Sequence, residues 1–563
     1  MSLAAFPLSP KEALVESYQG QSLHQVPMPA AVIDVAKVKA NCRAMLDAVE
    51  AHGLKFRAHV KTHKTSEVTR LQVGEDCKDV RLVASTLIEI DQLVPLLLDY
   101  QQRKAKVNVL YGVPLGSSQV RRLASIARAL GEGSITAMID HPQQLESLKE
   151  FKDLAGFPAC IFIKTDCGYH RAGLGPSSAE MQELVEQVSR AEQEESLLLL
   201  GFYSHNSLSY GGSSPDDAMD ALKQEIDVCR EASQHFKRNR QSPLLVSVGA
   251  SPTVLSLQNV LPSNSSSSNS ANALIDSLEL TKSNLELEVH AGVYPIFDMQ
   301  QVAASSRQLT SDAHDTIAAS VLTEVCSLYP KRTERPEALV SAGVLALARE
   351  PCKDYSGWGV VSPWNMPTAY NISKQDRIVV ARISQEHGIL AFEEQKAVRQ
   401  LPLQYGQKLR LWPNHACITL AMFGWYLVVD SSSDAPDKII DVWSRYVPFP
   451  KPSGEPGRTV GGSILQGMLV DDMQQVAAKG NQTSLLRTKS KLDSKPAEVR
   501  TVQTTKEQPD DRDMDGSRHK LQPRQCTGVG NNSECGRDSD RPANGMARYS
   551  HPLSISISKK ELS

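Results

Sequence analysis

Short apolar runs alternate with helix-length segments from about residue 55 onward. Segments such as 117–130 and 179–191 have helical periodicity, and the apolar runs between the helices indicate buried strands. Eight strand–helix alternations predict a (β/α)8, TIM-like barrel of the α/β class in preference to an open doubly wound sheet. The predicted strands are 55–61, 80–85, 107–112, 135–140, 160–166, 197–205, 244–249 and 285–290.

The pattern changes after about residue 315, where short β-rich pieces are separated by Gly, Pro, Asn and Asp. This pattern of short apolar pieces separated by turn residues predicts a C-terminal antiparallel β-rich domain. Its predicted strands are 318–327, 338–346, 377–384, 408–412 and 425–430, and one further strand, 31–35, precedes the barrel series. We therefore expect an N-terminal segment at 1–30, a barrel domain at 31–315 and a β-rich domain at 316–450.

Two segments have too few apolar residues to join a core. The Ser- and Asn-rich stretch 262–272 predicts a disordered surface insertion, which we place within a low-complexity insert at 257–283. The tail 451–563 is polar apart from a short apolar stretch at 464–470, and its composition predicts disorder.

Composition excludes several classes of protein. The net charge is -3 over 563 residues, which gives no argument for a nucleic-acid partner or an anionic membrane surface. No apolar run reaches the roughly 18 residues of a membrane span, and no basic start followed by an apolar core indicates a secretory signal. The 10 cysteines form no CxxC pair and no disulfide framework. We expect a cytoplasmic protein that acts on a small molecule.

The first candidate for chemistry is Lys61, at the end of the first predicted barrel strand between His59 and His63. Barrel active sites lie at the carboxyl ends of the strands, where a desolvated lysine can form a Schiff base with an aldehyde cofactor. Most lysines are surface residues, so a structural interpretation stays open on this motif alone. Lys64 is the competing lysine, and its position one turn into the next helix predicts solvent exposure.

Two further strand ends carry polar loops. Arg171 lies in a glycine-containing loop after strand 160–166, where it could donate to a phenolate or a carboxylate. Tyr203 and Tyr210 flank the end of strand 197–205, and buried tyrosines need partners for their hydroxyl groups. An incidental arginine and core tyrosines are the alternative interpretations.

The strand 244–249 runs into the sequence Gly249-Ala250-Ser251-Pro252-Thr253. Serine as cap and proline at the first helical position predict a helix N-terminus, whose free N–H groups suit a phosphate. An ordinary capped turn is the commoner outcome of such a sequence.

A histidine and a cysteine lie two residues apart, at His415 and Cys417. In a strand they would share one face, and imidazole with thiolate makes a partial zinc site. Only two ligands are visible, so a buried histidine beside a small cysteine is the structural alternative.

These motifs, in this order, resemble the D-serine dehydratases and D-threonine aldolases, which are pyridoxal-phosphate enzymes of the alanine-racemase-like fold. The resemblance covers roughly residues 25–447. It implies that strand 31–35 pairs with the C-terminal domain. It also implies that pyridoxal 5′-phosphate is carried by Lys61, the first lysine of an H-x-K-x-H-K pattern, that Arg171 approaches its 3′-oxygen, and that Tyr203 and Tyr210 approach the cofactor.

The same resemblance implies a phosphate site made by Gly249, Ala250, Ser251 and Tyr294. The chain departs from the family's pattern at Ser207 and Val293, where glycine and asparagine are usual.

The H-x-C pair distinguishes two activities within the resemblance. D-serine dehydratases carry H-x-C and bind Zn2+, whereas D-threonine aldolases carry H-x-D and suit manganese-like ions. His415 and Cys417 therefore imply zinc and a β-elimination that converts D-serine to pyruvate and ammonia. The family resemblance as a whole implies a homodimer. The rivals are a metal-dependent aldolase of β-hydroxy D-amino acids, a non-catalytic pyridoxal-phosphate-binding protein and a degenerate barrel enzyme.

Overall fold

The computed structural model describes residues 11–446 apart from 238–241, 262–267, 310, 333–334 and 395–398. Its larger part is a closed barrel of eight parallel strands in the order β2 to β9. The strands are β2 (Lys55–His59), β3 (Asp79–Ala84), β4 (Lys106–Pro114), β5 (Ile135–Ile139), β6 (Ala159–Lys164), β7 (Leu197–Tyr203), β8 (Leu245–Val248) and β9 (Glu286–Ala291). All eight strands predicted from the apolar runs are confirmed.

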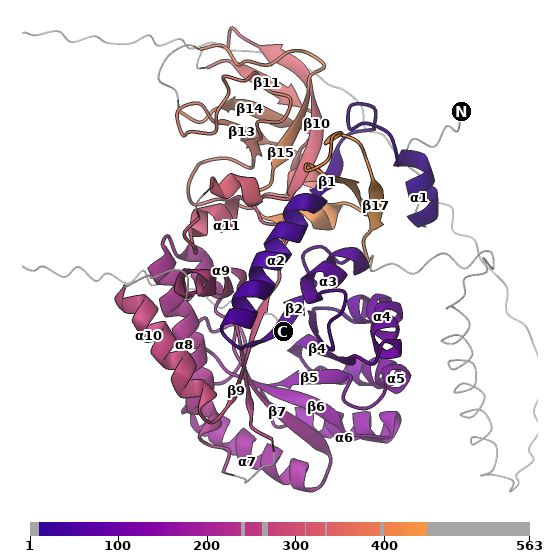
Figure 1. Ribbon diagram of the computed structural model, residues 1–563, viewed down its shortest axis with the longest axis vertical. Coiled ribbons are helices and arrows are strands. Elements are labelled where there is room, and N and C mark those ends of the chain that lie inside the picture. Colours follow the sequence, from indigo (N-terminus) through magenta and orange to yellow (C-terminus); the bar gives the residue numbers. More distant parts are fainter. Residues whose placement is uncertain are drawn as a thin grey trace, which may run out of the picture. The chain divides into compact units, whose positions relative to one another are not determined.

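Helices cover the outside of the barrel (Figure 1). They are α2 (Val35–Ala51), α3 (Ser66–Val73), α4 (Leu87–Gln102), α5 (Val120–Leu130), α6 (Gln144–Ala155), α7 (Ala179–Gln193), α8 (Pro215–Ser233), the short α9 (Ser251–Leu255) and α10 (Asn269–Lys282). Several begin at a hydroxyl cap that accepts an N–H of the first turn. Examples are Thr65 with Val68 N, Thr86 with Glu89 N and Ser214 with Asp217 N.

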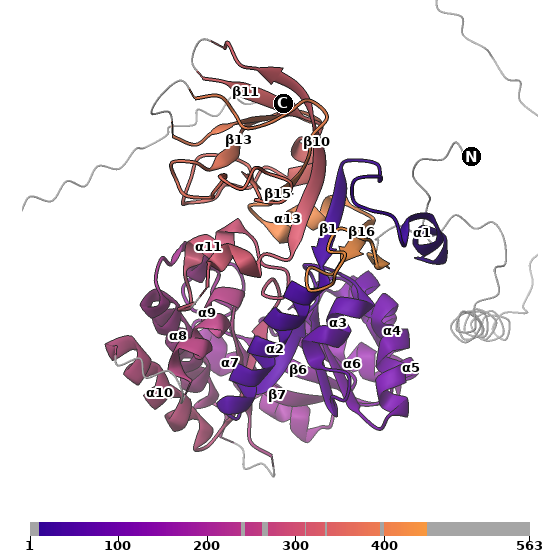
Figure 2. The same ribbon diagram turned by 45° about the horizontal axis from the view of Figure 1, so that its top comes forward.

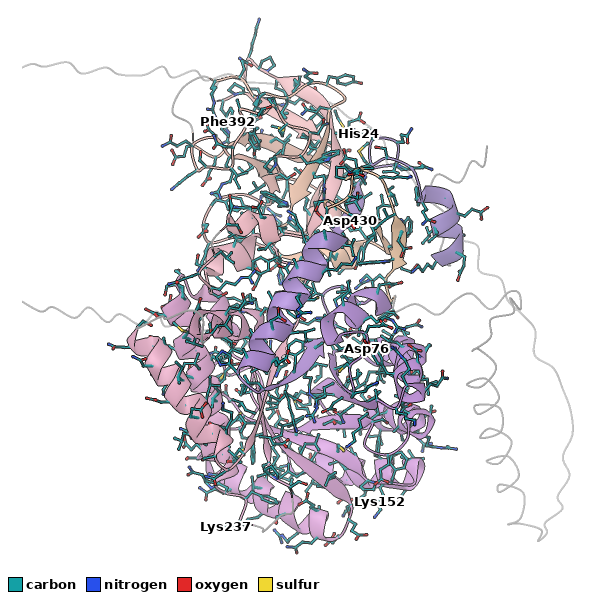
Figure 3. The ribbon with its side chains drawn as sticks, in the orientation of Figure 1. His24, Asp76, Lys152, Lys237, Phe392 and Asp430 are labelled. Atoms are coloured by element: carbon teal, nitrogen blue, oxygen red, sulfur yellow. The ribbon has the colours of Figure 1, made fainter. Side chains whose placement is uncertain are left out.

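The barrel interior is filled rather than open. Its centre is an apolar cluster made by Val83, Leu110, Met138, Phe162, Tyr203 and Leu245. Below this cluster the fully buried Arg57 donates to Glu288 at 2.7 Å and to Asn108 at 2.7 Å. Lys152 and Lys237 mark the end of the barrel that lies away from the β-rich domain (Figure 3). The filled interior leaves the carboxyl ends of the strands as the place for a site.

The remaining strands form a nine-stranded sheet in the order β11-β14-β13-β12-β15-β10-β1-β16-β17. These are β1 (Ala30–Asp34), β10 (Ala319–Tyr329), β11 (Glu337–Val340), β12 (Val360–Val361), β13 (Ile378–Ile383), β14 (Gly388–Phe392), β15 (Lys408–Trp412), β16 (Trp425–Val429) and β17 (Asp441–Ser444). A further pairing of β10 with β11 closes part of the sheet into an antiparallel barrel. Figure 2 shows this domain beyond the end of the helix-covered barrel.

The early strand β1 belongs to the second domain, as expected. It pairs antiparallel with β10 and parallel with β16, and α2 then carries the chain from this sheet to the first barrel strand. The short helices α11 (Met299–Ala304), α12 (Val344–Leu347) and α13 (Ala416–Thr419) complete the region beside the barrel, and α1 (Lys11–Tyr18) precedes β1.

The predicted insert at 257–283 needs correction. Residues 269–282 form helix α10, which begins at Ser268, whose side chain accepts from Ala271 N. Ala271, Leu274 and Leu278 are buried on one face, so a helical apolar stripe follows directly after the Ser-rich run. Residues 262–267 and the predicted disordered tail at 451–563 lie outside the described residues.

Candidate functional site

A cavity of about 280 Å³ lies at the carboxyl ends of the barrel strands. It brings together most of the residues singled out in the sequence, namely Lys61, Arg171, Tyr210, Ala250, Ser251, His415 and Cys417. A second cavity of about 600 Å³ shares Lys61, Arg171, His59 and His205 with it and adds Tyr203. Lys61 and Arg171 therefore stand where the two cavities meet.

The cavity distinguishes the two lysines of the first strand end. Lys61 follows β2, and its main-chain N–H donates to His59 Nδ1 at 3.4 Å. Lys64 has a left-handed backbone (φ 51°) and its ammonium pairs with the buried Glu89 at 2.7 Å. Lys64 is consequently held away from both cavities by its ion pair, although it is less exposed than its position in the sequence predicts.

The loop after β6 is folded back on itself around Asp166. This carboxylate accepts from Gly168 N at 3.0 Å and from His170 N at 3.1 Å. Gly173 has φ +101°, and a Cβ there would lie 2.9 Å from the main chain of Asp166, so this turn requires glycine. The turn brings Arg171 to the cavity wall, where its guanidinium lies 5.5 Å from the centre of the Tyr169 ring.

The two predicted tyrosines occupy different positions. Tyr210 lines the first cavity together with Ser251, and burial raises the pKa of Tyr210 well above its usual value. Tyr203 lines the neighbouring cavity, and its ring stacks on that of His290 with centroids 4.2 Å apart and planes at 7°. Tyr210 therefore faces the loop proposed for phosphate, whereas Tyr203 faces the barrel centre.

Three histidines of the site were not predicted from the sequence. His59, His205 and His290 lie at the ends of β2, β7 and β9, and all three line the first cavity. His205 Nδ1 lies 2.6 Å from the carbonyl oxygen of Gly249, which fixes the ring. Their common signal is a histidine at a barrel strand end, and this signal becomes visible only once the strands are assigned together.

The turn after β8 differs from its prediction in one detail. The cap of α9 is Ala250, not serine; Ser251 is the first helical residue and its hydroxyl accepts from Gly292 N at 3.2 Å and Val293 N at 3.0 Å. Gly249 has φ +140°, and a Cβ there would lie 2.4 Å from His290 O. Glycine is required because the ends of β8 and β9 approach so closely.

Tyr294 does not join this turn. It is fully buried outside both cavities, with its ring edge-on to Phe56 at 5.9 Å, and its hydroxyl lies beside Cys42 and Gln72. The neighbouring Gly292 and Val293 line the cavity instead. The phosphate contact expected from Tyr294 thus has no geometric support, because the chain after β9 turns this side chain towards α2 and α3.

The His415–Cys417 pair lies at the start of helix α13, with His415 as its cap and Cys417 in its first turn, and not on a strand as expected. Strand β15 ends at Trp412, and His415 immediately precedes helix α13. Asp298 accepts from Ala416 N at 2.8 Å and holds this helix start in place. Both side chains nevertheless reach the same cavity, where Cys417 Sγ lies 3.1 Å from the hydroxyl of Thr62, the residue after Lys61.

The surroundings of His415 are anionic. Its Nδ1 lies 3.6 Å from a carboxylate oxygen of Glu350 and has no hydrogen-bond partner. Burial lowers the pKa of His415, but hydrogen bonding to Cys417 and the charges of Cys417, Asp298 and Glu350 outweigh burial and raise it to about 9. Within the described part of the chain, no group of three or more His, Cys, Asp or Glu side chains is arranged to hold a metal ion. The pair would therefore supply two ligands and leave other positions for water or substrate.

We expect acid to destabilise this fold through its buried histidines. Burial lowers the pKa of His63 from 6.5 to about 4, so His63 is neutral in the folded protein, while the unfolded chain takes up its proton below about pH 6.5. The free energy of unfolding should fall as the pH drops from about 6.5 to 4, with about 3 kcal/mol due to His63. Chemical denaturation across this range measures the slope.

The variant His63→Gln should flatten that slope relative to the wild type. The exposed His141 offers the matched control, since His141→Gln should leave the slope unchanged. Parallel curves for the wild type and His63→Gln would contradict the assignment.

Comparisons with known proteins agree with this arrangement of domains. The family described as "Alanine racemase, N-terminal domain" matches residues 33–265, and "Putative serine dehydratase domain" matches residues 318–429. D-serine dehydratase of Schizosaccharomyces pombe is 38% identical over 440 residues, which span 77% of this chain and 94% of the relative. That of Saccharomyces cerevisiae is 32% identical and covers 78% and 99%. This chain belongs to the D-serine dehydratase family.

Solved structures show the same fold. D-threo-3-hydroxyaspartate dehydratase from Delftia sp. HT23 superposes with a TM-score of 0.59 at 24% identity, covering 76% of this chain and 99% of that one. D-threonine aldolase from Filomicrobium marinum gives a TM-score of 0.56 at 19% identity, covering 76% and 97%. The alanine-racemase-like fold and the family expected from the motifs are confirmed. Membership of the D-serine dehydratase family implies pyridoxal phosphate as cofactor.

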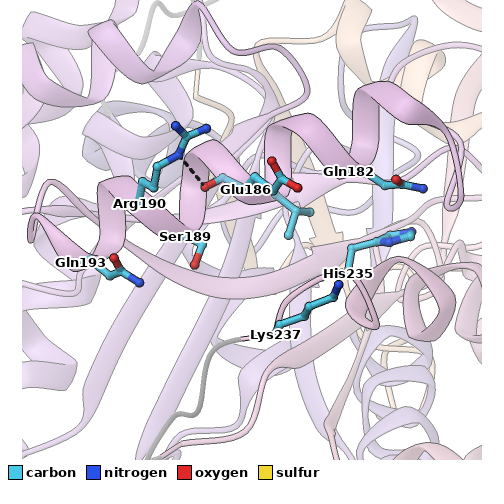
Figure 4. A pocket seen from close by; sticks show the side chains of 8 residues that line it. Gln182, Glu186, Ser189, Arg190, Gln193, His235 and Lys237 are labelled. Carbon is cyan, nitrogen blue, oxygen red and sulfur yellow. Dashed lines mark hydrogen bonds between the residues drawn. The ribbon is translucent and has the colours of Figure 1, made fainter.

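Another cavity of this family member, about 460 Å³, lies away from the strand ends. It is bounded by α7 and the segment after α8, with Glu186, Arg190, His235 and Lys237 among its walls (Figure 4). Its walls carry both signs of charge, and none of the predicted site residues lines it.

In the described ranges, no helix is both long and apolar enough to cross a membrane.

Proposed function

We propose that this chain is a D-serine dehydratase, an ammonia-lyase that converts D-serine to pyruvate and ammonia by pyridoxal-phosphate-dependent, zinc-assisted β-elimination. The observation that carries the proposal is that Lys61 and the His415–Cys417 pair line one cavity. A base for the Cα proton and a metal site for the Cβ hydroxyl are the two groups this elimination needs. D-serine dehydratases at 38% and 32% identity support the choice of substrate.

The residues at the strand ends fit pyridoxal phosphate. Lys61 lines the cavity, and among the described residues it has no acidic partner of the kind that holds Lys64. In the turn of Gly249, Ala250 and Ser251, residue 249 has only main-chain atoms, because a Cβ there would collide with β9. We assign the aldehyde to Lys61, the phosphate to this turn with Tyr210, and the ring's 3′-oxygen to Arg171. The bound cofactor supplies an electron sink for the charge that develops at Cα.

The His415–Cys417 pair fits zinc. Imidazole and thiolate are soft enough for this ion. Among the described residues the buried His415 Nδ1 has no hydrogen-bond partner, so this nitrogen is available to coordinate a metal. Zinc held there would act as a Lewis acid on the departing hydroxyl group. Thr62 contacts Cys417 Sγ, so the chain that carries Lys61 also orients the sulfur ligand.

Lys61 has two tasks in this scheme. Its amine would hold the cofactor in the resting enzyme, and the same amine, when free, would be the base for the Cα proton of D-serine. Cys417 in place of aspartate disfavours the aldolase alternative, because an oxygen ligand would favour harder metals.

We expect a cytoplasmic homodimer with no nucleic-acid or membrane partner. Support for a subunit contact comes from apolar side chains near the cavity: Tyr169, which lines it, is 40% exposed, and Leu208, next to the lining residue Ser207, is 58% exposed. Sedimentation analysis of the purified protein tests this expectation.

Pyruvate release from D-serine by the cofactor-loaded protein tests the function. We expect turnover that is lost on chelation and restored by zinc, since the hydroxyl group is a poor leaving group without a Lewis acid. D-threonine in place of D-serine, with glycine and acetaldehyde as the measured products, is the control for aldol cleavage. Glycine formation without pyruvate would replace this proposal by the aldolase.

A further inference from the structure

Glu225 is a buried carboxylate that the proposed chemistry leaves unused. It lies on α8, its side chain is fully buried, and it lines neither of the two cavities at the strand ends. A buried carboxylate is costly unless its oxygens accept hydrogen bonds. Its partners therefore indicate why the fold retains it.

Both oxygens of Glu225 are bonded to loops that carry site residues. One accepts from the main-chain N–H of Asn206, which directly follows His205 in the loop after β7. The other accepts from the hydroxyl of Thr253 at 2.9 Å, in the turn after β8. One side chain thus connects two loops that are distant in sequence.

Thr253 extends this connection to the proposed phosphate turn. Its hydroxyl oxygen accepts from Ala250 N at 2.8 Å while donating its proton to Glu225. The loop after β7 meets the same turn a second time, since His205 Nδ1 lies 2.6 Å from the carbonyl oxygen of Gly249. Glu225 and His205 therefore hold the loop and the turn against each other beside the proposed phosphate position.

The carboxylate is carried by a well-anchored helix. α8 begins at the cap Ser214 with proline in its first turn, and it packs along α10. Burial raises the pKa of Glu225 to about 7, although its hydrogen bonds to Asn206 and Thr253 oppose this. A side chain that is uncharged but keeps the same shape, as in glutamine, should consequently preserve most of the arrangement.

We propose that Glu225 is a positioning residue for the cofactor phosphate, which acts by holding the turn 249–251 against the loop that carries Tyr210. This inference rests on the proposed binding of pyridoxal phosphate at that turn. It requires Glu225 to matter for the phosphate group specifically and not for the rest of the cofactor.

Comparing pyridoxal 5′-phosphate with pyridoxal, which lacks the phosphate, separates these cases. The dissociation constants of both ligands are measured by absorbance for the wild type, Glu225→Ala and Glu225→Gln. In Glu225→Ala the N–H of Asn206 and the hydroxyl of Thr253 lose their acceptor, so we expect the affinity for the phosphorylated ligand to fall about tenfold or more. The affinity for pyridoxal should change by less than about threefold, and Glu225→Gln should restore most of the loss.

Asp227 provides the matched control on the same helix. Its carboxylate pairs with Lys223 at 2.6 Å and Arg230 at 2.8 Å and bonds to Ser277 of α10, away from the site. Asp227→Ala should leave both dissociation constants unchanged. If Glu225→Ala does not fold, Thr253→Val removes the bridge to Ala250 at nearly constant volume, and it should show the same selective loss.

The outcomes are distinguishable. Equal weakening of both ligands in Glu225→Ala and Thr253→Val would make Glu225 a general structural residue and overturn the inference. A wild type that binds neither ligand would overturn the proposed function and, with it, this role. Selective loss with rescue by glutamine supports both.

Discussion

Replacing Lys61 by alanine is expected to abolish pyruvate formation from D-serine, with a loss of at least about a thousandfold. The reason is that one amine both attaches the cofactor and removes the Cα proton in the proposed scheme. It lies at the junction of the two cavities, where substrate and cofactor must meet. Steady-state assays measure the loss in turnover. Borohydride reduction of the loaded wild type, followed by peptide mapping, identifies the modified lysine.

Lys64 and Lys164 are the controls for this prediction. Lys64 is held by Glu89, and Lys64→Ala should keep the cofactor attached. Lys164 is buried in the wall of the second cavity, where its ammonium donates to Thr165 O at 2.8 Å. A cofactor found on the peptide of either residue, or turnover retained in Lys61→Ala, would contradict the assignment of Lys61.

The barrel could be predicted from the sequence because its strands are buried on both faces. Strands β5 and β6 are buried along their whole length and apolar except at Thr136 and Lys164, and amphipathic helices bound them, so local composition alone marks them. The second domain was predicted less completely. Strands β12, β14 and β17 are only two to five residues long, and β12 and β14 each pair on one side with a strand that is distant in sequence, β15 and β11 respectively. Strands of this kind depend on long-range pairing more than on their own composition.

Parts of the candidate site could be predicted where the residues that shape a loop are neighbours in the sequence. The loop around Arg171 and the turn at Gly249 are fixed by nearby glycines, and both reach the cavity. The direction of the Tyr294 side chain could not be predicted in this way, because it is decided by packing against α2 and α3 and not by its neighbours in the chain. Glu225 gives no signal either, since a glutamate in an amphipathic helix is indistinguishable from a surface residue until its loops are placed.

Replacing Cys417 by alanine is the second decisive experiment. His415 and Cys417 are the two proposed zinc ligands in the cavity, so Cys417→Ala should lose bound zinc and reduce turnover by at least about a hundredfold, given that even outer-shell changes cost 10- to 100-fold. Zinc content by elemental analysis and pyruvate release, measured on the same preparation, check the two parts. Lys61 is untouched, so the cofactor chromophore should remain.

Cys326 serves as the control for this variant. It is exposed on β10 and its thiol donates to the carbonyl oxygen of Glu324 at 3.4 Å, so Cys326→Ala should retain zinc and turnover. Because Cys417 must bind as a thiolate, the zinc affinity of the wild type should fall as the pH is lowered, and this dependence should weaken in Cys417→Asp, which carries an oxygen ligand of lower pKa. Zinc and turnover that survive Cys417→Ala would remove the metal from the mechanism and leave Lys61 and the cofactor to expel the hydroxyl group unaided.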